Sequence, residues 1–148
     1  MRWNRIVTAG LLAGIVLVAF EAASEPLFRG QMEALFSRLG LPMPGRGAML
    51  ARVGALLALG IGTVWLYGSL ETRYGRGTRT AVVAGGTVWA LTCLFASFMM
   101  YSFGIFTAQF FWMSAAYSLP QAVISAMAGA WLYRRKASSA AGFATARA

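Results

Sequence analysis

Four polar side chains recur along one face of a long apolar segment near the C-terminus. Ser114, Ser118, Gln121 and Ser125 follow one another at intervals of four, three and four residues, which places them on one side of an α-helix. Hydroxyl and amide groups in this pattern could line a path for a solute or hold a lipid head group. They could also bond to neighbouring helices, as small polar residues commonly do in membranes. We favour this packing interpretation and keep the polar lining as the alternative.

Two isolated charges, Glu21 and Arg52, lie near the ends of two apolar runs. If the runs are antiparallel helices, these residues lie at similar depths, because each helical residue advances the chain by about 1.5 Å. A charge near hydrocarbon is costly, and it either pairs with an opposite charge or extends to the head groups. The sequence therefore predicts a buried ion pair between Glu21 and Arg52. The alternative is two interfacial side chains that each reach lipid head groups.

Several chemistries lack their usual residues. The chain has no histidine and a single cysteine, Cys93, inside an apolar run. An intramolecular disulfide, His-ligated zinc or haem, and a His-dependent triad are therefore excluded. The Gly/Arg stretch 71–79 lacks the lysine and spacing of a phosphate-binding loop, and a serine without a base is not an activated nucleophile. We expect a non-enzymatic protein with no catalytic residue, metal or cofactor, apart from bound lipid; contact with a pigment or quinone is a less favoured alternative.

The composition is that of a polytopic membrane protein. Of 148 residues, 59% are hydrophobic and 11% are charged, whereas about a quarter are charged in a soluble domain. The net charge of +9 would suggest nucleic acid in a soluble protein. Here the basic residues flank apolar runs, where they contact anionic lipids, so we expect no nucleic-acid binding. The residues expected at the lipid head groups are Arg73, Arg76, Arg79, Arg134, Arg135 and Lys136.

The apolar runs predict an all-α membrane protein. Four transmembrane helices are expected, at about 5–23, 48–70, 80–101 and 108–133. Residues of about 25–39 carry apolar side chains at helical spacing, with charges on another face, and predict an amphipathic helix at the membrane surface or across the bundle mouth. Ser24 is its candidate N-cap and Pro26 suits its first turn. Residues 1–136 would form a single bundle, and 137–148 a flexible cytoplasmic tail.

Small residues mark two faces for helix packing. Gly10 and Gly14 form a GxxxG motif, which we interpret as a packing groove within the same bundle. Gly54, Ala58 and Gly62 recur four residues apart and give the second predicted helix a face suited to helix contact.

Two sequence motifs in the second half of the chain resemble those of a protein family. These are VWLYGSLETRYGRGTRTAVVAGGTVW (64–89) and GAWLYRRK (129–136). Over residues 64–136 the chain resembles an uncharacterised family of small bacterial four-helix integral membrane proteins. The shared pattern is a WLY ending, a Gly/Arg turn, a small-residue third helix and a closing WLY-basic stop, whereas residues 24–47 depart from it. The resemblance implies a topology and a bacterial inner membrane, and it implies no activity.

Two function classes stay open. Small size, missing catalytic groups and small-residue faces favour an accessory or scaffolding subunit of a larger membrane complex. Its partners would be membrane lipids and either other membrane-protein subunits or further copies of the chain. The alternative is a small oligomeric channel or transporter, with the polar face of residues 114–125 lining the path. What covers the lipid-facing surfaces would separate the two.

Basic residues also predict the orientation. Two lie at the N-terminus, three in the loop 71–79 and three directly after Tyr133, whereas the connection 102–107 is uncharged. The positive-inside rule therefore places both termini and the loop 71–79 in the cytoplasm. In a Cys93→Ala background, a Thr72→Cys variant should react with an impermeant maleimide only after the membrane is opened. A Ser102→Cys variant should react in intact cells, and the reverse labelling pattern would contradict the orientation.

Overall fold

The structure, a computed structural model, describes the backbone of residues 3–145 and the side chains of residues 3–135. In this range every regular element is a helix, so the predicted all-α class is confirmed. The helix Thr78–Trp89 (α3), the π-helical turn Ala90–Leu94 (η1) and the helix Phe95–Ser102 (α4) form one continuous rod. The elements are α1 (Trp3–Arg38), α2 (Arg46–Tyr74), α3 (Thr78–Trp89), η1 (Ala90–Leu94), α4 (Phe95–Ser102) and α5 (Ala108–Thr145).

Three of these rods are long and apolar enough to cross a membrane. They are Trp3–Arg38, Arg46–Tyr74 and Thr78–Ser102, and each exceeds the about 20 residues that a bilayer core requires. α5 has the length, but Ser114, Ser118 and Gln121 interrupt its apolar run, and it is not one of the three. Over the residues that the structure describes, the protein is therefore helical with three membrane-capable rods, and a fourth crossing by α5 stays a prediction.

The expected boundary between a first membrane helix and an amphipathic helix is wrong. α1 runs without a break from Trp3 to Arg38, with Pro26 inside it. Ser24 does not cap a new helix, since its hydroxyl donates to the Glu21 carbonyl oxygen one turn earlier at 2.9 Å. An internal proline removes a single backbone donor, and packing of Phe28 against Phe110 on α5, with 5.9 Å between ring centroids, holds the helix beyond it. Whether residues 25–39 lie at the membrane interface stays a prediction.

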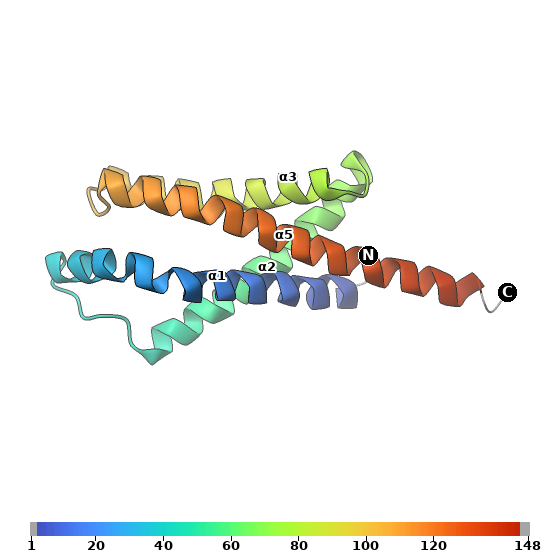
Figure 1. Ribbon diagram of the computed structural model, residues 1–148, viewed down its shortest axis with the longest axis horizontal. Coiled ribbons are helices and arrows are strands. Elements are labelled where there is room, and N and C mark those ends of the chain that lie inside the picture. Colours follow the sequence, from blue (N-terminus) through green and yellow to red (C-terminus); the bar gives the residue numbers. More distant parts are fainter. Residues whose placement is uncertain (1–2, 146–148) are drawn as a thin grey trace.

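α1 and α5 run side by side in opposite directions (Figure 1). At one end, Tyr133 of α5 packs against the cluster that contains Ile6 and Ala9 of α1. At the other end, Phe28 meets Phe110. The rod of α3 and α4 follows α5, and α2 crosses the bundle obliquely (Figure 1). The turn between α2 and α3 therefore lies at the same end of the bundle as the start of α1.

α1 and α2 touch backbone to backbone where they cross. A Cβ atom added to Gly60 would lie 2.3 Å from the Gly14 nitrogen and 2.5 Å from the Gly10 carbonyl oxygen. No real Cβ atom tolerates such distances, so each of these positions requires glycine. The GxxxG of α1 is thus filled from within the chain, by the glycine of α2.

This crossing generates a prediction about stability. Gly60→Leu should lower the free energy of unfolding by about 3 kcal/mol or more, because the clash is with backbone and cannot be relieved by a rotamer change. Gly62→Leu is the matched control, since an added Cβ there meets nothing within 4 Å. Thermal unfolding in detergent would measure both. Equal midpoints for the two variants would contradict the crossing.

Candidate functional site

The polar face of α5 borders a cavity of about 160 Å³ between the helices. All four residues of the predicted stripe line it: Ser114, Ser118, Gln121 and Ser125. Glu21 of α1 and Ser97 of α4 add further polar groups, and Leu56 and Leu59 of α2 form apolar wall. The stripe therefore faces the interior of its own bundle.

Two members of the stripe bond to neighbouring helices. Gln121 Nε2 donates to the Leu17 carbonyl oxygen of α1 at 3.3 Å, and the Trp89 indole nitrogen of α3 donates to Ser118 Oγ at 2.9 Å. Ser125 is 1% exposed, and its hydroxyl donates to Ala122 of its own helix. These bonds are those of the packing interpretation.

Three other polar groups at the cavity form no such hydrogen bonds. Among the residues that the structure describes, the hydroxyls of Ser97 and Ser114 and Oε1 of Gln121 have no hydrogen-bond partner. Ser97 and Gln121 are only 9% and 5% exposed. None of the three atoms is fully enclosed, since the fully enclosed unpaired side-chain atoms of the described residues are Gln31 Oε1 and the Tyr67 hydroxyl. The three groups are therefore polar surface that opens onto the cavity and that water could reach.

The π-helical turn η1 shapes the opposite wall. It follows Trp89 and brings Thr92 and Cys93 to the cavity. Such turns insert one residue into an α-helix and are frequent at functional sites. Composition and periodicity of the third apolar run gave no sign of it, so neither Cys93 nor Ser97 was expected here.

The structure brings Glu21 and Arg52 together, with Arg52 Nη2 donating to Glu21 Oε2. The Glu21 side chain is 29% exposed and that of Arg52 is 63% exposed. The pair therefore lies at the rim of the cavity, covered by the chain on the glutamate side only. It differs in this respect from the buried pair that the sequence predicts.

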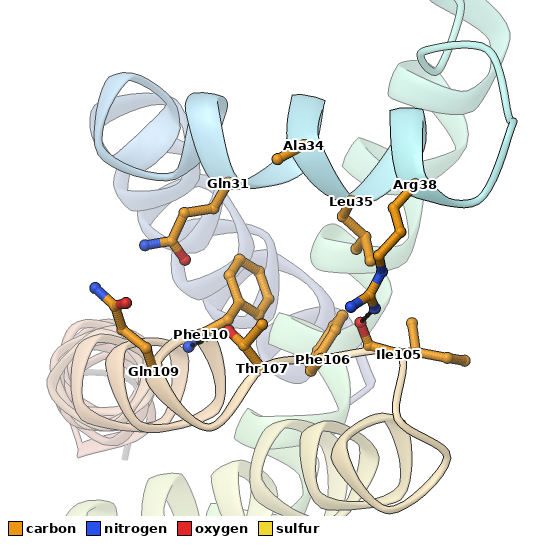
Figure 2. Close-up of a pocket in the computed structure, with 9 residues that line it drawn as sticks. All are labelled: Gln31, Ala34, Leu35, Arg38, Ile105, Phe106, Thr107, Gln109 and Phe110. Atoms are coloured by element: carbon orange, nitrogen blue, oxygen red, sulfur yellow. Dashed lines mark hydrogen bonds between the residues drawn. The ribbon is translucent and has the colours of Figure 1, made fainter.

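A second cavity, of about 210 Å³, lies between the end of α1 and the connection to α5 (Figure 2). Arg38 reaches across it, and its Nη2 donates to the carbonyl oxygens of Gly104, at 3.0 Å, and Ile105. Gln31 Nε2 contacts the sulfur of Met113 at 3.3 Å, while Gln31 Oε1 is buried without a partner among the described residues. Arg38 thus ties the end of α1 to the connection, a contact that the sequence did not indicate.

The residues expected at lipid head groups lie near one end of the bundle. Arg76 pairs with Glu71, and the Arg135 guanidinium lies 5.2 Å from the Trp131 ring centroid. Arg73 and Arg79 are exposed, and Arg134 Nε donates to the Ala130 carbonyl oxygen. The Lys136 side chain lies outside the described residues.

Comparisons of the chain with models of known protein families, with curated proteins and with solved structures find no match. The resemblance of residues 64–136 to small bacterial membrane proteins therefore rests on the sequence motifs alone. Among the described residues, no three Cys, Asp or Glu side chains lie together as a group that could hold a metal ion.

The ion pair can be tested by a double-mutant cycle. Glu21→Gln leaves Arg52 without its partner and should destabilise the protein by about 1 kcal/mol. In the double variant Glu21→Gln with Arg52→Gln, part of this loss should be recovered, because no unpaired charge remains. Unfolding in detergent or bicelles measures the loss of stability in each single variant and in the double variant. Strictly additive losses would show that the two side chains act independently.

Proposed function

We propose that the protein is a non-catalytic accessory or scaffolding subunit of a larger complex in a bacterial inner membrane, and that α2 is its docking helix. The observation that carries this proposal is a face of small residues on α2 that no described residue covers. All members of this outer face are exposed. They are Gly47, Ala51, Gly54, Ala58 and Gly62.

The spacing of these residues suits a second helix. They follow at intervals of four, three, four and four residues, which keeps them on one side of α2. A Cβ atom added to Gly54 or Gly62 meets nothing within 4 Å, whereas Gly60, on the other side of the helix, is filled by α1. Because small residues let helix backbones approach closely, such a face gains more from a partner helix than from lipid tails.

Large apolar side chains accompany this face. Trp65 lies one turn beyond Gly62 and is 47% exposed, and Leu50 is 73% exposed. Every residue from Leu39 to Ala55 is exposed, so the described part of the chain covers little of the first turns of α2 apart from the contact of Arg52 with Glu21. A rigid aromatic anchor beside a small-residue groove is a favourable pattern for a protein interface.

The proposal also includes how the helices are placed in the membrane. α5 forms a fourth crossing, residues 25–39 lie at the outer interface, and both termini are cytoplasmic. Support comes from the basic residues of the α2–α3 turn and of α5, which gather near the start of α1. At that end they would meet anionic head groups.

The channel alternative is less well supported. An oligomeric path would require the stripe of α5 to face a central axis between copies. Ser125 and Gln121 are instead 1% and 5% exposed within one chain, so they have little surface to offer to such an axis.

The docking face can be tested by co-purification in nanodiscs with quantitative mass spectrometry. The wild-type chain should retain a second membrane protein in fixed ratio, and the variant Gly54→Leu with Gly62→Leu should lose it while unfolding at the wild-type temperature. Gly86→Leu on α3 is the matched control, since an added Cβ there also meets nothing within 4 Å, and it should keep the partner. A wild-type chain that isolates alone, or a double variant that keeps the partner, would contradict the proposal.

A further inference from the structure

We propose that the cavity beside α5 is a hydrated site for a small uncharged polar solute. Three groups point to a ligand there: the hydroxyls of Ser97 and Ser114 and Oε1 of Gln121, which have no hydrogen-bond partner among the described residues. This site is independent of the proposed docking function, because it lies on the inner side of α2 and not on its outer face.

The first step of the argument is energetic. An amide or hydroxyl group held away from water without a partner costs about 1–3 kcal/mol. Gln121 and Ser97 are more than nine-tenths buried as whole residues, but Gln121 Oε1 and the Ser97 hydroxyl are not among the fully enclosed unpaired atoms. The cavity is therefore where a hydrogen-bond partner can reach them. The volume of about 160 Å³ exceeds the about 30 Å³ that each water occupies in the liquid. It has room for several waters or for one solute of a few heavy atoms.

The charge of the lining selects an uncharged solute. Glu21 is the charged residue among those that line the cavity, and Arg52 neutralises it. The remaining polar groups are hydroxyl, amide and thiol, which offer hydrogen bonds but no compensating charge. An ion that left water for this site would therefore lose hydration without an opposite charge to replace it.

The entrance lies beside the ion pair. Glu21 lines the cavity and also contacts Arg52, whose side chain is 63% exposed. In this region α2 diverges from the bundle (Figure 1), and all of its residues from Arg46 to Ala55 are exposed. A solute would thus enter between α1 and the N-terminal half of α2.

The single native cysteine provides a direct probe of hydration. Cys93 lines the cavity, and alkylation proceeds through a thiolate, which forms readily only where water is present. In membranes, iodoacetamide, a small uncharged polar reagent, should alkylate Cys93 at least about tenfold faster than a cysteine in lipid. The reference is Leu91→Cys in a Cys93→Ala background, because Leu91 lies on the same π-helical turn and is 69% exposed.

Two further measurements test the size of the cavity and the charge of the molecules that can enter it. Ser114→Leu should fill part of the cavity and slow alkylation of Cys93 severalfold, whereas Leu119→Met, at an exposed position of α5, should not change it. A quaternary-ammonium methanethiosulfonate should react with Cys93 far more slowly than iodoacetamide does, each relative to a free thiol. Alkylation of Cys93 no faster than at position 91, or no dependence on the charge of the reagent, would overturn the proposal.

Discussion

α1 and α2 approach backbone to backbone where they cross at Gly10, Gly14 and Gly60, and the rest of the bundle depends on this crossing. Backbones can approach this closely only where no side chain intervenes, and lipid tails cannot replace such a contact. The crossing fixes which side of α2 turns inward. It thereby leaves the opposite side, with Gly54 and Gly62, free at the surface.

The same crossing determines how the polar face of α5 is used. α1 presents the carbonyl oxygens of Leu17 and Phe20, which accept hydrogen bonds from Gln121 and Tyr117. These bonds hold α5 along α1, so the stripe of serines cannot turn to lipid. Where α2 diverges, however, the walls no longer meet, and a cavity with unused polar groups remains. One part of this face of α5 thus packs against α1, and the next part lines the cavity that we propose to bind a solute.

Regular periodicity made much of the fold predictable. The apolar runs predicted the helices, and the GxxxG motif predicted a packing groove on α1. The spacing of residues 114–125 predicted that their polar side chains share one face of α5. Local signals failed where tertiary packing outweighs them: Ser24 and Pro26 indicate a helix start, yet contacts of Phe28 with α5 carry α1 through them. The turn η1 and the contact of Arg38 with the 103–107 connection had no sequence signal, because both arise from how separate helices fit together. For that reason the polar stripe was found, but not the cavity around it.

The most direct test of an outward-facing α2 is site-specific photo-crosslinking in native membranes. A photoreactive phenylalanine analogue at position 65 replaces an exposed tryptophan with a side chain of similar size. It should form an adduct with a membrane protein other than a second copy of this chain, whereas the same analogue at Leu91 should react with lipid. Adducts at position 65 with lipid alone, or only with another copy of the chain, would contradict the docking role of α2.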